Sequence, residues 1–198
     1  MSSVRPLSPI TTQNLVFNVT GTLFLLPDPV TCFCSASYNQ IQTFHLSANS
    51  SLILLDWVTS GRKSRGEDWV FSRYYSVNEV FVDGKRLIKD VMLLEADPLS
   101  EKGLASKLAP YSCYANLILS GPTTQDIIRH LVDSYGRISI MQATQPPDLL
   151  WSLSQVDSGS AIVRVAGKDT EAVKHWLAEA LSPAERVMGV DLYRRILR

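Results

Sequence analysis

The sequence has few of the residues on which common catalytic and metal-binding motifs depend. Among its 198 residues are 3 cysteines and 3 histidines, and they are not spaced as a zinc site or as a disulfide framework. The glycine patterns of a P-loop, a dinucleotide-binding fold and a nucleophile elbow are also missing. No catalytic motif stands out, although a Ser/His/Asp arrangement assembled from distant positions stays open.

The sequence also lacks an excess of charge of either sign and any long apolar run. Its 19 basic residues balance its 19 acidic residues, which argues against nucleic acid or an anionic membrane as a partner. No apolar run approaches the roughly 20 residues that cross a bilayer, and the N-terminus has no apolar core of signal-peptide length. We therefore expect a soluble, cytoplasmic protein, and the odd cysteine count fits a reducing compartment.

What the sequence does contain is a series of short β-prone runs. Asp83-Gly84 between two of them predicts a hairpin, because a type I′ turn needs positive φ at both central residues. Around this turn, Ser51–Glu95 reads as consecutive antiparallel strands. The predicted strands are two short runs within Leu15–Leu26, then Thr31–Gln40, Ile41–Ala48, Leu52–Val58, Trp69–Ser76, Asn78–Val82, Arg86–Glu95, Ser112–Leu119, Ile138–Ala143, Trp151–Val156 and Ala161–Val165.

Helices are predicted only in the C-terminal half. One amphipathic helix begins at 123–124 and ends at Gly136, and a second begins at 169–170 and is broken before Pro183. A short basic helix follows at 184–198. The pattern predicts a mainly β fold with two or three helices.

The domain organisation follows from composition. Residues 1–14 are rich in serine, proline and threonine, so we expect a poorly ordered lead-in. Residues 15–198 are then one domain, a size at which one hydrophobic core suffices.

Three acidic residues are candidate functional groups: Asp28, Asp56 and Glu67. Asp56 interrupts an apolar strand, where an acid must either face solvent or be paired. Arg62 and Arg65 lie just across the following turn and are candidate partners. One interpretation is a structural ion pair that fixes the turn. The other is a polar surface or channel lining that handles a cation or a partner.

The cysteines and histidines have simpler interpretations. Cys32 and Cys34 form a C-x-C on a predicted strand, so their side chains would share a face. That pair can hold a soft metal, but the packing of two small apolar side chains is the commoner arrangement. We expect a packing role for Cys113 and structural roles for the histidines, which are His45, His130 and His175.

Four segments of the sequence resemble one protein family. They read LLPDPVTCF (Leu25–Phe33), LLDWVTSGRKSRGEDWVF (Leu54–Phe71), FVDGKRLIKDVMLLE (Phe81–Glu95) and AIVRVAGKDTEAVKHWL (Ala161–Leu177). They are similar to the urease accessory protein UreD, also called UreH, and the resemblance runs from about Leu25 to the C-terminus. The residues that carry the motif are Pro27, Pro29, Trp57, Gly61, Arg62, Arg65 and Gly66.

The resemblance implies layered β-sheets and a non-enzymatic role. Members of this family act with UreF and the GTPase UreG on apo-urease, to which they help deliver nickel. It implies no tightly bound cofactor, with nickel handled transiently along a polar internal route. Asp28, Asp56 and Glu67 are then the candidate oxygen ligands, since oxygen ligands suit transient contact with a hydrated divalent ion.

One departure from the family keeps alternatives open. Members carry further β-structure before the Pro27-Asp28-Pro29 motif, whereas here only Thr11-Thr12-Gln13 resembles an earlier element. The chain therefore resembles a form truncated at the N-terminus. A non-functional or regulatory form is one alternative. A hydrolase built on Asp28, Asp56 and Glu67 is another, and it predicts an activity that Asp56→Asn abolishes.

Overall fold

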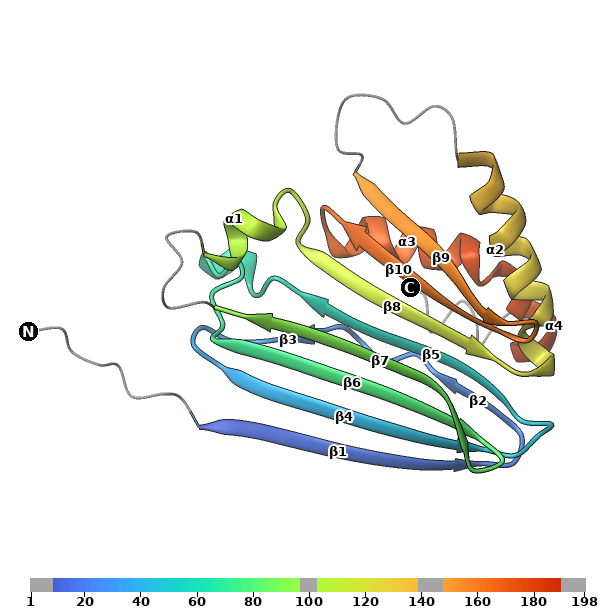
Figure 1. Cartoon of the computed structure of the whole chain (residues 1–198). Helices are drawn as coiled ribbons and strands as arrows, with labels where there is room; N and C mark the ends of the chain where they lie inside the picture. Colours follow the sequence, from blue (N-terminus) through green and yellow to red (C-terminus); the bar gives the residue numbers. More distant parts are fainter. Residues whose placement is uncertain (1–8, 97–102, 139–147, 190–198) are drawn as a thin grey trace, which may run out of the picture.

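The protein consists of two stacked β-sheets with helices on one outer face (Figure 1). The computed structural model describes residues 9–96, 103–138 and 148–189. The mainly β class is confirmed, with helices mostly in the C-terminal half. Within the described residues, no helix has the length and apolar character needed to cross a bilayer.

The first sheet has four strands in the order β1-β4-β6-β7. Strands β1, β4 and β6 run parallel, and β6 and β7 form an antiparallel hairpin. The hairpin turns at Asp83-Gly84 as predicted, with φ of 47° and 78°. The four strands are β1 (Ile10–Val19), β4 (Ser37–Leu46), β6 (Arg73–Val82) and β7 (Lys85–Glu95).

The second sheet has six strands, in the order β2-β5-β8-β10-β9, with β3 also paired to β5. Strands β2 and β3 run parallel to β5, while β8, β9 and β10 pair antiparallel. Both sheets are therefore mixed. The six strands are β2 (Thr22–Leu25), β3 (Val30–Thr31), β5 (Ser51–Thr59), β8 (Cys113–Ser120), β9 (Leu149–Asp157) and β10 (Ser160–Gly167).

Helices α2, α3 and α4 cover the outer face of the six-stranded sheet, whereas α1 packs at one end of the two sheets (Figure 1). At the start of α3 the Asp169 carboxylate accepts from the Ala172 N–H at 2.8 Å, as a predicted cap should. The α-helices are α1 (Leu104–Leu108), α2 (Gln125–Ile138), α3 (Thr170–Ala180) and α4 (Glu185–Met188), and the 3₁₀ turns are η1 (Lys63–Arg65), η2 (Pro122–Thr124) and η3 (Ser182–Ala184).

Strand β5 is a central strand of the six-stranded sheet, which lies between the helices and the first sheet. All nine of its residues are buried, because alternate side chains pack on the helices and on the first sheet. Leu52, Leu54 and Val58 face the first sheet, whereas Ile53 and Leu55 face the helices. The burial of both faces explains why this segment reads as a continuous apolar run.

Several predicted boundaries are wrong, and the reasons are local. Residues 10–14 belong to β1 rather than to a poorly ordered lead-in, because β1 is an edge strand on which their exposed and mostly polar side chains are tolerated. The predicted strand Thr31–Gln40 is interrupted, since Ser35 has φ of 61°. Trp69 has φ of 53°, so the predicted strands on either side of Val77 are one strand that begins later, at Arg73.

The pairing within Ser51–Glu95 is also wrong. Strands β5 and β6 lie in different sheets, so only β6 and β7 of this stretch form an antiparallel pair. Gly136 does not end α2, which continues to Ile138. The predicted strand at Ile138–Ala143 otherwise lies outside the described residues, as do residues 1–8 and 190–198.

The packing between the sheets predicts the effect of a large-to-small substitution. The Phe44 side chain is fully buried and stacks on Phe17, with ring centroids 4.9 Å apart. We expect Phe44→Ala to lower the free energy of unfolding by about 3–5 kcal/mol through lost burial and a cavity. The control Val16→Ala, at a side chain that is 65% exposed, should change it by about 0.5 kcal/mol or less. Urea denaturation measures both, and equal effects would contradict this packing.

Candidate functional site

The buried Asp56 carboxylate joins the two sheets. It lies on β5 of the second sheet and is 3% exposed. Its donors come from β4 and β6 of the first sheet. They are Gln40 Nε2 at 3.2 Å, the Tyr74 hydroxyl at 3.2 Å, Ser76 Oγ at 2.5 Å and Asn78 Nδ2 at 2.6 Å. The four hydrogen bonds equal the number that a carboxylate can readily accept.

The alternation of β-strands explains how these donors come together. Tyr74, Ser76 and Asn78 are two residues apart on β6, so all three side chains point to the same face. Gln40 and Gln42 have the same relation on β4. The Gln42 amide donates to Asn78 Oδ1 at 3.0 Å, which fixes the amide orientation that lets Asn78 donate to Asp56.

A second buried carboxylate, Asp90, lies beside the first group. It is on β7 and is 4% exposed. Asn116 Nδ2 of β8 donates to its Oδ2 at 2.8 Å, and Arg164 of β10 donates to its Oδ1 at 2.6 Å. The Arg164 side chain is 51% exposed. Asp90 therefore has a cationic partner, whereas the four donors to Asp56 are neutral groups.

The two groups are neighbours in both sheets. Asp56 is the register partner of Asn116 between β5 and β8, and Asn78 is the register partner of Asp90 between β6 and β7. Directly opposite residues on adjacent strands have Cβ atoms about 4.5–5.5 Å apart. We call this set the polar layer; its members are Gln40, Gln42, Asp56, Tyr74, Ser76, Asn78, Asp90, Asn116 and Arg164.

The polar layer divides the apolar packing between the sheets. One buried cluster contains Leu54 and Phe44, and the other contains Val58 and Phe71. Along β5, Asp56 lies between these clusters. The polar layer therefore runs across the strand direction and has members in both sheets.

Both ends of the polar layer approach the surface. At the β1 edge, the Tyr38 hydroxyl donates to Gln13 at 2.5 Å and, more weakly, to Gln40 at 3.4 Å. At the other end, Asp90 and Arg164 line a pocket of about 540 Å³. Its walls also include Met92, Tyr114, Leu150 and Trp151.

The tyrosine hydroxyls of this region remain donors. Burial, and secondarily the charge of Asp56, raises the pKa of Tyr74 well above its usual value. Burial likewise raises the pKa of Tyr38, with smaller contributions from Cys32 and Asp56. Both hydroxyls therefore keep their protons at neutral pH.

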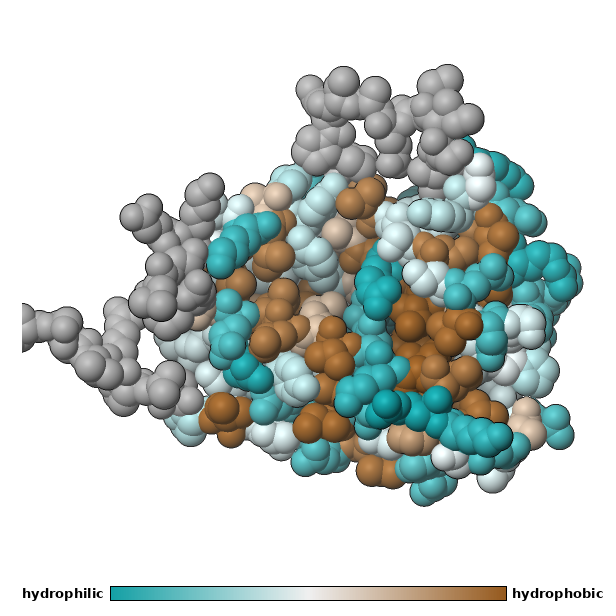
Figure 2. All heavy atoms as spheres, in the orientation of Figure 1, coloured by the Kyte–Doolittle hydropathy of each residue, from teal (hydrophilic) through white to brown (hydrophobic). Residues whose placement is uncertain are grey.

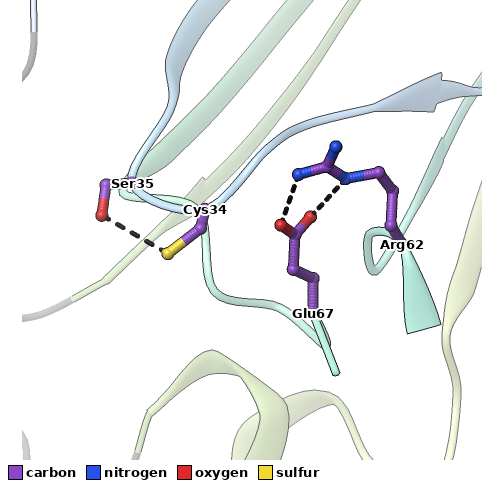
Figure 3. Close-up of polar contacts among 4 residues, drawn as sticks. All are labelled: Cys34, Ser35, Arg62 and Glu67. Carbon is purple, nitrogen blue, oxygen red and sulfur yellow. Dashed lines mark hydrogen bonds and ion pairs between the residues drawn. The ribbon is translucent and has the colours of Figure 1, made fainter. Parts of the chain in front are cut away.

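Neither Asp28 nor Glu67 has a hydrogen bond to the polar layer among the described contacts. Asp28 is exposed in the loop between β2 and β3. Glu67 accepts from Arg62 Nε at 2.8 Å and from Arg62 Nη2 at 2.5 Å (Figure 3). That hydrogen-bonded pair lowers the pKa of the Glu67 carboxyl. The three carboxylates of the hydrolase hypothesis therefore have separate surroundings.

The predicted pairing of Asp56 with Arg62 or Arg65 is wrong. Arg62 binds Glu67 and lies over the Phe33 ring at 4.5 Å, and Arg65 is exposed in η1. The arginines lie beyond the end of β5, while the Asp56 side chain points back between the sheets.

The remaining motif residues shape the loops at this end of β5. The Trp57 indole N–H donates to the Pro27 carbonyl at 2.8 Å, which ties the Pro27–Pro29 loop to β5. Gly61 has φ of 129°, and a Cβ there would lie 3.1 Å from the Glu67 carbonyl. Gly66 has φ of 74° and closes η1. These positions need glycine because positive φ disfavours a side chain.

The cysteines do not form a pair. Cys32 is buried and Cys34 is exposed, because the chain leaves β3 at Thr31 and turns at Ser35. The Cys34 thiol instead lies 3.6 Å from the Ser35 hydroxyl (Figure 3). Among the residues that the structure describes, no three His, Cys, Asp or Glu side chains are grouped as a metal site.

Sequence reasoning found Asp56 but missed its partners. The sequence predicts only that Gln40 and Asn78, which donate to Asp56, lie on strands, and the same holds for Asp90 and Asn116 of the second group. A polar side chain at a core-facing position of a β-prone run is the signal that can find them. Arg164 carries the same signal inside β10, where it follows four buried residues.

The geometry predicts the stability of an isosteric variant. In Asp56→Asn, one carboxylate oxygen becomes an NH₂ group that faces buried donors, and Gln40 or Asn78 must turn or lose its acceptor. We expect the free energy of unfolding to fall by about 1–3 kcal/mol. Asp83→Asn is the matched control at an exposed turn, since asparagine tolerates its positive φ. Urea denaturation measures the free energy of unfolding of both variants, and we expect its dependence on urea concentration to keep the same slope. Equal stability of the two variants would contradict this hydrogen bonding.

The thiol environments predict a count of reactive cysteines. Burial raises the pKa of Cys32 to about 11 and that of Cys113 to about 12, so the reactive thiolate is scarce at mildly alkaline pH. We expect Ellman's reagent to titrate one thiol, Cys34, in the native chain and all three in denaturant. Rapid reaction of three thiols in the native chain would contradict this burial.

Comparison with known proteins agrees with the resemblance in the sequence. The model of the UreD urease accessory protein family matches residues 8–196. Urease accessory protein 4 of Cryptococcus neoformans is 33% identical over 175 residues, which cover 81% of this chain and 54% of that protein. Urease accessory protein D of Arabidopsis thaliana is 33% identical, over 86% of this chain and 65% of its own length.

A bacterial relative gives the same result. Urease accessory protein UreD of Anaeromyxobacter is 32% identical, over 87% of this chain and 56% of its own length. The chain thus spans between about half and two thirds of the curated relatives that it matches. By its family match and these identities, this chain belongs to the UreD family of urease accessory proteins.

Proposed function

We propose that this chain acts in urease maturation as a non-enzymatic accessory protein that passes nickel toward apo-urease through its polar layer. Family membership supports the urease part of the proposal. One observation carries the nickel part: a carboxylate that is 3% exposed, Asp56, lies between the sheets with only neutral donors around it. A buried carboxylate with no cationic partner has a charge that a passing cation can balance.

The groups around Asp56 can turn oxygen atoms toward a cation. The hydroxyls of Tyr74 and Ser76 present lone pairs when their hydrogens rotate away. A half turn of the Asn78 amide exchanges its NH₂ group for its carbonyl oxygen, and a Gln40 half turn does the same. Because Asn78 accepts from Gln42, Gln42 must turn with it. The site would then offer a set of oxygen ligands.

Oxygen ligands fit transport better than storage. Carboxylate, hydroxyl and amide oxygens hold a divalent transition metal less tightly than thiolate or imidazole does. The layer itself contains no cysteine or histidine. Asp56 and Asp90 would give a hydrated nickel ion two successive anionic stations, since Asp56 is the register partner of Asn116 and Asp90 is the register partner of Asn78. Weak, repeated contact allows the ion to leave as easily as it enters.

Asp28 and Glu67 have a different place in the proposal. Both lie outside the polar layer, and Glu67 is engaged by Arg62. We propose that Asp28 and Glu67 belong to the surface that a partner or an arriving ion contacts first. The conformation of that surface is stabilised by the Trp57–Pro27 hydrogen bond and by the turn that contains Gly61, Arg62 and Gly66.

The proposed partners are the UreF and UreG accessory proteins and apo-urease, with the cytoplasm as the compartment. Membership of the UreD family supports a place in this machinery. The hydrolase alternative gains no support, because its three carboxylates lie in separate surroundings: Asp56 is buried, Glu67 binds Arg62 and Asp28 is exposed. A regulatory or inactive form is the other alternative, and complementation tests it.

Complementation separates these candidates. We expect the chain to restore urease activity to a strain that lacks UreD, and to co-purify with UreF there. Asp56→Asn should reduce restored activity toward the level of the empty strain while co-purification with UreF persists, because the variant removes a nickel station and leaves the surface intact.

The control for this experiment is Asp83→Asn, which lies at the exposed β6–β7 turn, outside the polar layer. It should restore activity as the unaltered chain does. A folded chain that neither co-purifies with UreF nor restores activity would contradict the proposal and favour the regulatory or inactive form. Full activity with Asp56→Asn would contradict the nickel route.

A further inference from the structure

The β10 end of the polar layer is occupied by a cation that belongs to the chain itself. Arg164 Nη2 lies 2.6 Å from Asp90 Oδ1, and no other charged side chain donates to a carboxylate of the layer in the described structure. Asp90 is 4% exposed, whereas the Arg164 side chain is 51% exposed. One end of this ion pair is thus fixed in the interior and the other end faces solvent.

This arrangement blocks a second cation. A guanidinium and a divalent ion would repel each other strongly at contact distance in a partly buried site. Asp90 Oδ2 is already held by Asn116 at 2.8 Å, so Oδ1 is the oxygen that an entering ion would need. Arg164 occupies that oxygen.

The pocket beside Asp90 can accommodate the Arg164 side chain when its guanidinium leaves the carboxylate. Arg164 and Asp90 line the pocket of about 540 Å³, together with Met92, Leu150 and Trp151. Apolar walls suit the long stem of an arginine, and a tryptophan ring can receive its guanidinium. On the face seen in Figure 2, hydrophilic side chains form a column between two apolar patches.

We propose that Arg164 closes the β10 end of the polar layer, and that a divalent cation passes this end only by replacing the Arg164 guanidinium on Asp90. The inference rests on the proposed function, since it specifies how the same layer admits nickel. With Arg164 on Asp90 the end is closed. With Arg164 turned into the pocket, Asp90 Oδ1 faces the entrance and the ion balances its charge.

The exchange has a physical advantage over simple entry. Breaking a buried pair by removing one partner leaves an uncompensated charge, which is strongly unfavourable. Replacement of one cation by another keeps Asp90 balanced in both states. The two states can then lie close in free energy, and a ligand shifts the population between them.

The test is isothermal titration of nickel chloride into the folded full chain and its variants. Arg164→Gln should bind nickel at least about tenfold more tightly than the unaltered chain, because the competing charge is gone. The double variant Asp90→Asn/Arg164→Gln should lose that gain. Arg129→Gln is the matched control, since Arg129 is an exposed arginine paired with Asp126 on α2. This variant should bind nickel with the same affinity as the unaltered chain.

A second measurement uses the unaltered chain, in case Arg164→Gln does not fold. Phenylglyoxal modifies accessible arginines, and peptide mass spectrometry reports each site. Nickel should increase modification of Arg164 and leave that of Arg129 unchanged. No nickel-dependent change at Arg164 would overturn the inference.

The outcomes distinguish this inference from the proposed function. Equal nickel affinity of the unaltered chain and Arg164→Gln, with binding lost in Asp56→Asn, would overturn closure by Arg164 and leave the nickel route standing. Absence of nickel binding in the unaltered chain and in Arg164→Gln would overturn the route and the closure together.

Discussion

The structure depends on one buried carboxylate that joins two sheets. Asp56 of β5 accepts four hydrogen bonds from β4 and β6 of the facing sheet. Apolar side chains allow sheets to slide over one another, but a carboxylate with four donors has one satisfactory position. The relative placement of the sheets, and the second group around Asp90, follow from this contact. Without Asp56, these four donors would lose their acceptor.

A polar layer in the middle of a sandwich costs stability that apolar packing would provide. It splits the interior into two apolar clusters, so neither is as large as the interior allows. Proteins keep such arrangements at functional sites. We propose that in this accessory protein the buried, oxygen-rich layer handles a cargo ion. The Arg164–Asp90 pair gives the layer a closed state that the chain supplies itself.

The sequence predicted what depends on neighbouring residues. The Asp83-Gly84 hairpin, the Asp169 cap and the apolar β5 are local features, and all three are present. The UreD resemblance was visible in the motif around Asp56. The partners of Asp56 were not predictable in this way, because they come from strands that are distant in sequence. Arg62 and Arg65 are close in the chain, yet β5 ends before them and the chain crosses between sheets before β6 begins.

The central claim is that the polar layer receives a divalent cation between the sheets. The most direct measurement is a crystal of the chain soaked in nickel, with diffraction data collected on both sides of the nickel absorption edge. The account predicts an anomalous peak within coordination distance of an Asp56 or Asp90 carboxylate oxygen. Anomalous peaks confined to surface histidines such as His45 and His175, with none between the sheets, would contradict it.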